Sequence, residues 1–217
     1  MSNSSSITIH TKSQNFYLVI KRIIDIIFSL IGSIICLPIF LIIALVVKIC
    51  DGGGSTVFFH HKRIGYKGKP ITILKFRTMV PDAEERIKQF TPEQKKEWEE
   101  NAKLQDDPRV TKVGKFLRKT SIDELPQIFE ILTGKLSIIG PRPITEEEFI
   151  EHHIPIQKYT SVKPGLTGYW ACNGRSNTSY EERTKLELYY VDHFSLWLDI
   201  KIFFKTIVSV LEHRGAL

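Results

Sequence analysis

The hydrophobic pattern of the chain is dominated by one apolar stretch near its start. From Ile26 to Val47 there are 22 consecutive residues without a charged side chain. As a straight helix this run would measure about 33 Å, which is enough to cross the hydrocarbon core of a bilayer. No small-residue cleavage site follows the run, so it does not fit a secretory signal peptide. The pattern therefore predicts a helix in contact with a membrane.

The residues around this run favour one membrane topology over another. Lys21 and Arg22 precede it and Lys48 follows it, so the positive-inside rule places both ends on the cytoplasmic side. Pro38 lies within the run, where it removes a backbone donor and favours a kink. A re-entrant helix satisfies both observations, and a straight span is the alternative. Asp25, at the N-terminal edge, could pair with Lys21 or Arg22 near the headgroups.

The rest of the chain has the patterns of an α+β fold that is mostly helical. Two runs rich in β-branched and aromatic residues, 57–61 and 71–76, are joined by a turn containing Gly and Lys and predict a β-hairpin. Apolar residues at helical spacing, capping signals and turn residues predict helices over 81–89, 91–103, 110–119, 123–132, 145–153 and 179–194. The expected organisation is a disordered lead over 1–20, a membrane-inserted helix over 21–50 and one cytoplasmic domain over 51–217.

Two further segments are amphipathic enough to lie at a membrane surface. In 110–119 an apolar stripe is flanked by lysine and arginine, and in 194–211 apolar residues surround only three charged ones. Each could be an interfacial helix beside anionic lipids, with Trp197 at the headgroup level in the second. A helix that faces the protein core explains the stripe of 110–119 equally well, and for 194–211 it is the weaker alternative. An interfacial position is the expectation for both.

The composition limits the chemical classes of partner but does not identify one. The 217 residues suit one sizeable domain. The net charge of +6 favours an anionic partner, which nucleic acid, an anionic lipid surface and a phosphorylated substrate would all satisfy. The three cysteines form no C-x-x-C pair, which is typical of reduced thiols rather than of a disulfide framework.

Asp123 and Glu124 are the strongest candidates for chemistry. Ser121 stands three residues before Glu124, in the spacing of a capping box, which predicts that both carboxylates lie in the first turn of a helix. A structural explanation suffices locally, because acids there offset the helix dipole by about 0.3–1 kcal/mol each. The same location would also keep a carboxylate ionised, as a nucleophile or a metal ligand must be.

Three arginines could bind the phosphate groups of a phosphorylated substrate. Arg118, Arg142 and Arg175 are the candidates. Arg142 lies between two prolines, which fix the backbone on both sides of a guanidinium that must be held in place. An ordinary loop with an exposed arginine is the alternative. The Gly-marked turns at 163–168 and 172–175 surround aromatic residues and suggest a binding loop.

Several short stretches, each weak alone, occur in a specific order along the chain. They are Lys21-Arg22 with Asp25 and the Pro-broken apolar run, Arg63-Ile-Gly65, Lys75-Phe-Arg-Thr-Met79, Leu117-Arg-Lys-Thr-Ser-Ile-Asp-Glu-Leu-Pro-Gln127, Gly140-Pro-Arg-Pro143, Lys163-Pro-Gly-Leu-Thr-Gly168, Asn173-Gly-Arg175 and Ser195-Leu-Trp-Leu-Asp199. In this order they resemble the bacterial sugar transferase family, the small monotopic phosphoglycosyl transferases. The likeness extends from Lys21 to about Leu217.

The resemblance implies an activity and a location. A sugar 1-phosphate would pass from a UDP-sugar to polyprenyl (undecaprenyl) phosphate, with release of UMP, as the first membrane step of surface polysaccharide or glycoconjugate synthesis. The chain would sit in the bacterial cytoplasmic membrane with its catalytic domain, 51–217, on the cytoplasmic face. Its partners would be the UDP-sugar, polyprenyl phosphate and anionic membrane lipids, with no nucleic acid, and a homodimer is allowed.

The resemblance also implies roles for individual residues. Asp123 would be the nucleophile that forms a covalent aspartyl phosphosugar, and Glu124 would be a ligand of Mg²⁺. The positions that would hold phosphates or the nucleotide are Lys75, Arg77, Arg118, Arg142 and Arg175. Asp199 matches an acid of the family to which no role is assigned.

Two other functions are compatible with parts of the pattern. A membrane-anchored basic module that binds nucleic acid or anionic lipid without catalysis would need neither Asp123 and Glu124 nor an arginine between prolines. A metal-dependent enzyme that transfers the sugar directly to an acceptor would release UDP rather than UMP.

Overall fold

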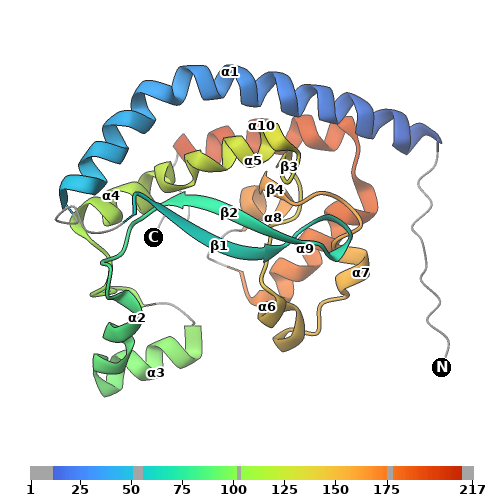
Figure 1. The fold of residues 1–217 in the computed structure, drawn as a ribbon. Coiled ribbons are helices and arrows are strands. Elements are labelled where there is room, and N and C mark those ends of the chain that lie inside the picture. Colours follow the sequence, from blue (N-terminus) through green and yellow to red (C-terminus); the bar gives the residue numbers. More distant parts are fainter. Residues whose placement is uncertain (1–11, 51–55, 102–103, 175–177, 212–217) are drawn as a thin grey trace. The chain divides into compact units, whose positions relative to one another are not determined.

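The computed structural model describes residues 12–50, 56–101, 104–174 and 178–211 (Figure 1). Helices predominate and one small antiparallel hairpin is present, so the predicted α+β, mostly helical fold is confirmed. The chain divides into two compact units, which are described separately. Unit 1 comprises the described residues of 1–34, 62–73 and 127–215, and unit 2 comprises those of 35–61 and 74–126.

The apolar run forms part of one long helix, α1 (Lys12–Cys50). It is helical throughout, including Pro38, and it is the one helix of the described chain that is long and apolar enough to cross a membrane. Most of its apolar side chains are exposed, with Ile34 at 67% and Leu41 at 65%. Because α1 begins at Lys12, residues 12–20 are helical and not part of a disordered lead, while 1–11 lie outside the described residues. The re-entrant path stays a prediction.

After α1 come short elements, and the described chain ends with two longer helices, α9 and α10. The predicted hairpin is present as β1 and β2, with a 3-10 turn η1 between them, and it contributes residues to both units. The predicted helix over 81–89 is a helical turn followed by a 3-10 turn. The elements are β1 (Phe58–Ile64), η1 (Tyr66–Gly68), β2 (Pro70–Phe76), α2 (Ala83–Arg86), η2 (Ile87–Gln89), α3 (Pro92–Asn101), α4 (Lys112–Thr120), η3 (Ile122–Gln127), α5 (Ile128–Thr133), β3 (Ser137–Ile139), α6 (Glu146–Glu151), α7 (Ile156–Tyr159), β4 (Gly165–Thr167), α8 (Tyr169–Asn173), α9 (Tyr180–His193) and α10 (Leu196–Leu211).

Unit 1 is built around a two-stranded parallel sheet, β3 and β4, in which Ser137 pairs with Gly165. The strand ends approach so closely that a Cβ atom on Gly140 would lie 2.7 Å from the backbone nitrogen of Gly165. Only glycine fits such an approach without a backbone shift. The core beside the sheet contains Tyr190 of α9 and Ile202 of α10, both about 1% exposed. The backbone on either side of the Gly140–Pro143 segment is thereby fixed.

Unit 2 carries the two adjacent acids. Helix α4 begins at the cap residue Thr111, whose hydroxyl accepts from the backbone N–H of Gly114, and a Cβ on Gly114 would lie 2.0 Å from the Thr78 carbonyl oxygen. The helix ends at Ser121, which has φ 57° and ψ 17°. The predicted capping box between Ser121 and Glu124 is therefore wrong, because an N-cap residue is extended and Ser121 is a left-handed C-cap of the preceding helix.

Candidate active site

Asp123 and Glu124 lie in the first turn of η3, as predicted, although the turn is 3-10 and not α-helical. The Glu124 carboxylate forms an ion pair with the ammonium group of Lys75 on β2. Asp123 is 8% exposed, and this burial, together with the charge of Glu124, raises its pKa to about 6 against the lowering effect of Lys75 and Arg118. A carboxyl with that pKa is still mostly ionised at neutral pH.

Arg118 completes this group from the last turn of α4. Its Nε donates to the Thr78 hydroxyl at 2.9 Å, which directs the guanidinium toward the start of η3. Burial lowers the pKa of Arg118, and the charge of Asp123 is the largest effect that opposes it. Asp123, Glu124, Lys75 and Arg118 therefore form one cluster of two acids and two cations.

The remaining predicted arginines do not all belong to this cluster. Arg77 donates to Thr56, from Nε to the carbonyl at 2.8 Å and from Nη2 to the hydroxyl at 2.7 Å, so these bonds hold the segment before β1. Arg142 belongs to unit 1. Arg175 lies outside the described residues.

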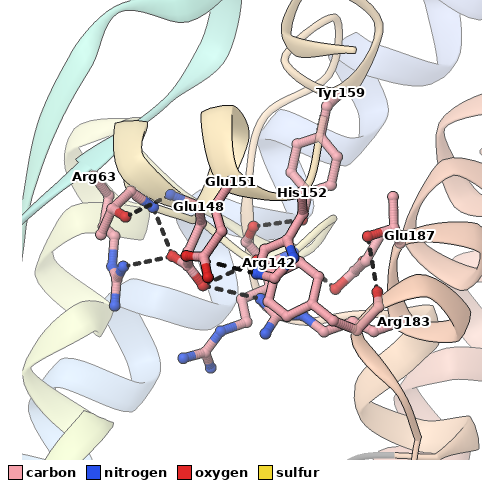
Figure 2. Close-up of polar contacts among 11 residues, drawn as sticks. Arg63, Arg142, Glu148, Glu151, His152, Tyr159, Arg183 and Glu187 are labelled. Carbon is pink, nitrogen blue, oxygen red and sulfur yellow. Dashed lines mark hydrogen bonds and ion pairs between the residues drawn. The ribbon is translucent and has the colours of Figure 1, made fainter. Parts of the chain in front are cut away.

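Arg142 is held by its backbone. Its N–H donates to Glu187 Oε1 at 3.1 Å, and its carbonyl accepts from the Tyr159 hydroxyl at 2.8 Å (Figure 2). The flanking prolines are both buried. Its guanidinium lies 5.9 Å from the ring centroid of Trp170, and its buried Nε has no hydrogen-bond partner among the described residues. These contacts fix the backbone of Arg142, and a fixed position of its guanidinium stays a prediction.

Two further arginines surround the same region of unit 1. Arg63 Nη1 lies 2.9 Å from one carboxylate oxygen of Glu148, and Arg183 Nη2 lies 3.7 Å from the other (Figure 2). Arg183 also sits between the rings of Trp170 and Tyr180, with centroids at 4.6 and 4.7 Å. Burial acts to raise the pKa of Glu148, but the N–H of Thr145 and these arginines outweigh it, and the pKa is lowered.

Sequence reasoning missed Glu187 and Arg183, which lie in α9. The only signal was their spacing, because residues four apart share a face of a helix. Glu187 is 1% exposed, and burial raises its pKa to about 7. Its Oε2 has no described hydrogen-bond partner.

The polar start of α1 is tied to unit 1 by side chains. Asp199 of α10 accepts from Lys21 Nζ at 2.6 Å, from the Tyr17 hydroxyl at 2.5 Å and from the Tyr190 hydroxyl at 2.8 Å. Arg22 donates to the carbonyls of 131 and 132 at the end of α5, at 2.6 and 2.8 Å. The predicted pairing of Asp25 with these cations is corrected, because its Oδ1 instead accepts from the Ser137 hydroxyl and the backbone N–H of residue 138. The three bonds to Asp199 give this carboxylate a structural role in unit 1.

Comparison with known proteins decides the family. The family model for the bacterial sugar transferases matches residues 16–213. The chain belongs to this family. It is 42% identical over 199 residues to the exopolysaccharide production protein ExoY of Sinorhizobium fredii, covering 90% of this chain and 87% of that protein.

Longer sugar transferases match the same region. The undecaprenyl-phosphate galactose phosphotransferase of Salmonella typhimurium is 42% identical over 200 residues, which is 91% of this chain and 41% of that protein. The UDP-glucose:undecaprenyl-phosphate glucose-1-phosphate transferase of Escherichia coli is 38% identical over 206 residues, 91% of this chain and 41% of that protein. The chain therefore spans about two fifths of these two family members and most of ExoY.

Proposed function

We propose that the chain is a phosphoglycosyl transferase that moves a sugar 1-phosphate from a UDP-sugar to polyprenyl phosphate and releases UMP. The observation that carries the proposal is the cluster of Asp123, Glu124, Lys75 and Arg118 in unit 2. Relatives named as undecaprenyl-phosphate sugar phosphotransferases support it.

The reaction proceeds in two displacements at phosphorus. In the first, the Asp123 carboxylate attacks the phosphate attached to the sugar, the bond to UMP breaks, and UMP leaves with the bonding electrons. In the second, a phosphate oxygen of the polyprenyl phosphate attacks the aspartyl phosphosugar, and the Asp123 carboxylate leaves. Splitting the transfer in this way suits two substrates that arrive from water and from the membrane. Lys75 and Arg118 stabilise the negative charge that develops on the phosphate oxygens.

The two carboxylates of the cluster could supply part of the coordination shell of Mg²⁺. Among the described residues no group of three or more His, Cys, Asp or Glu side chains could enclose a metal. Two adjacent carboxylates still suit Mg²⁺, which usually takes one or two protein carboxylates and completes its shell with substrate phosphates and water. Glu124 would hold the ion and exchange its contact with Lys75. The bound ion would neutralise charge on the diphosphate.

Arg142, Arg77 and Arg175 stay in the proposal as contacts for phosphates or the nucleotide. Arg142 has the strongest support, because both backbone polar groups are bonded by side chains and its Nε is left without a described partner. A guanidinium whose buried Nε has no described partner, on a backbone fixed in this way, is suited to bind an anionic ligand.

We also propose that α1 is re-entrant and that the catalytic residues face the cytoplasm. The lysine and arginine residues at both ends of the apolar run support this topology. Cysteines introduced at Ser4 and Gly52, both outside the described residues, should be labelled only from the cytoplasmic side. Labelling of the Ser4 position from outside would establish a straight span. An interfacial position of α10 is supported by its exposed apolar side chains, with Trp197 at 66% and Phe204 at 62%.

The chemistry is tested by incubating the purified chain with a panel of UDP-sugars and polyprenyl phosphate and identifying the released nucleotide. UMP is expected, and Asp123→Asn should abolish both turnover and an acid-labile phosphosugar adduct. Asp106→Asn is the matched control, since it removes a carboxylate that is 85% exposed in the same unit. Glu124→Gln should lower the Mg²⁺-dependent rate with folding retained. Release of UDP, or an adduct mapped to another residue, would overturn the covalent scheme.

A further inference from the structure

Unit 1 contains a cavity of about 230 Å³ beside the polar start of α1. One wall is formed by α1 between Tyr17 and Asp25, and the opposite wall includes Ser137, Lys163 and Tyr190. The catalytic cluster belongs to unit 2 and contributes no residue to this lining.

The lining is rich in positive charge. Lys21, Arg22 and Lys163 line the cavity, whereas Asp25 is its one acid. Lys21 is neutralised by Asp199, and Arg22 donates to two carbonyls at the end of α5. Among the described residues, Lys163 Nζ has neither an ion pair nor a hydrogen bond. The cavity therefore holds more positive charge than its own residues neutralise.

Arg22 and Lys163 face the same small space. A Cβ atom added to Gly134 would lie 3.2 Å from Arg22 Nη2 and 3.4 Å from Lys163 Nζ. Burial and the charge of Arg22 lower the pKa of Lys163, while Asp25 opposes them. Two cations brought together in a partly buried site destabilise one another, and Asp25, which already accepts bonds from Ser137 and the N–H of residue 138, supplies one negative charge against the two. A role in anchoring α1 explains Lys21 and Arg22, but it gives no reason for Lys163.

The cavity lies where the charges of α1 end. Asp25 lines the cavity and directly precedes Ile26, the first residue of the charge-free run. When the run is in the hydrocarbon, the cavity is at the depth of the lipid headgroups. Leu18 of α1 lines the cavity together with Val162 and Phe194, and these apolar side chains offer a surface for an acyl chain. An anion that enters here from the membrane would carry such a chain.

We propose that this cavity binds the phosphate headgroup of a membrane lipid, with Lys163 and Arg22 as its charged contacts. Ammonium and guanidinium groups form charge-assisted hydrogen bonds with phosphate oxygens. An anionic phospholipid and a polyprenyl phosphate carry the same group, and both fit the argument from charge and depth. The site is independent of the chemistry of Asp123, so an inactive variant should retain it.

The test uses the full chain with Asp123→Asn in a neutral detergent, so that failure of the site is distinguished from failure of the proposed reaction. Short-chain phosphatidylglycerol, a short-chain polyprenyl phosphate and inorganic phosphate are titrated separately, and the dissociation constants are measured. Lys163→Gln should weaken lipid binding about tenfold, which is the loss of one charge-assisted hydrogen bond. Lys163→Arg should retain binding, and Lys158→Gln is the matched control because it removes an exposed lysine of unit 1.

The outcomes separate the possible ligands. Weakening for phosphatidylglycerol alone assigns the cavity to a phospholipid, and weakening for the polyprenyl phosphate alone assigns it to the acceptor substrate. The proposal is overturned if Lys163→Gln binds both lipids as tightly as Lys158→Gln does. It is also overturned if inorganic phosphate binds as tightly as the lipids, which would indicate a general anion site. Melting temperatures without ligand show whether Lys163→Gln is folded.

Discussion

Glu187 gives unit 1 a pH-dependent stability that can be worked out from the structure. Burial of its carboxyl raises the pKa from the ordinary 4.5 to about 7. A carboxyl with a raised pKa binds its proton more tightly in the folded state, so its contribution is fully favourable below pH 4.5 and is lost as the pH rises through 7. One pKa unit corresponds to about 1.4 kcal/mol, so the folded state should lose roughly 3 kcal/mol over this range.

The perturbation that isolates this effect is Glu187→Gln. Glutamine keeps an oxygen to accept from the N–H of Arg142, and it cannot ionise. Its amide group would occupy the place of Oε2, which has no described partner, and leaving it unpaired costs about 1–3 kcal/mol at every pH. The absolute stability of the variant therefore matters less than its change with pH. Relative to wild type, the variant should gain roughly 3 kcal/mol between pH 4.5 and 8.

Thermal melting in buffered detergent across this pH range measures the difference. For a chain of this size about 1 kcal/mol shifts the melting temperature by roughly 2–4 °C, so the gap between the two proteins should change by roughly 6–12 °C. Glu181→Gln is the control, because it removes a carboxylate that is 79% exposed from the same helix. Parallel profiles for wild type and Glu187→Gln would refute the reasoning, since they would show that this carboxyl does not change its pKa on folding.

Two further substitutions test how the units are built. Asp199→Asn should destabilise unit 1 by roughly 2–4 kcal/mol in thermal melting, because the Lys21 ammonium, which is 13% exposed, loses its counter-ion. The control Asp192→Asn removes an exposed ion pair and should cost less than about 1 kcal/mol. Gly114→Ala should cost more than about 2 kcal/mol in unit 2, because its methyl group meets the Thr78 carbonyl oxygen at 2.0 Å. A melting temperature unchanged by Gly114→Ala would contradict the close packing of α4.

Features that depend on neighbouring residues could be predicted from the sequence. The helix α3 begins with reciprocal bonds between Thr91 and Gln94, and α9 begins with the same arrangement between Ser179 and Glu182, as their spacing predicted. The left-handed Gly134 ends α5 at the predicted place. Such signals work because donor and acceptor lie within one turn, so sequence spacing determines their distance.

Ser121 shows where local spacing stops being sufficient. The pattern S-x-x-E is satisfied, but the N–H of Ser121 bonds to the carbonyl of Arg118, which makes Ser121 the C-cap residue after α4. The next turn starts directly after it, and the N–H of Glu124 bonds to the backbone oxygen of Ser121 and not to its hydroxyl. A capping pattern assumes an extended residue before the helix, and two helical segments in immediate succession leave no room for one.

The contacts that link distant parts of the chain were beyond prediction for a different reason. Lys21 and Asp199 are separated by 178 positions, and their pairing depends on α10 lying beside α1, where the rings of Phe28 and Phe203 meet. The sequence nevertheless contains part of the information, because a charged residue within an apolar helix must find a partner when it is buried. Asp199 follows Leu196, Trp197 and Leu198 in an apolar segment, and in the structure it is 7% exposed and paired with a cation from elsewhere in the chain. Lys21, beside the start of the apolar run, is that partner and joins the start of α1 to α10 within unit 1.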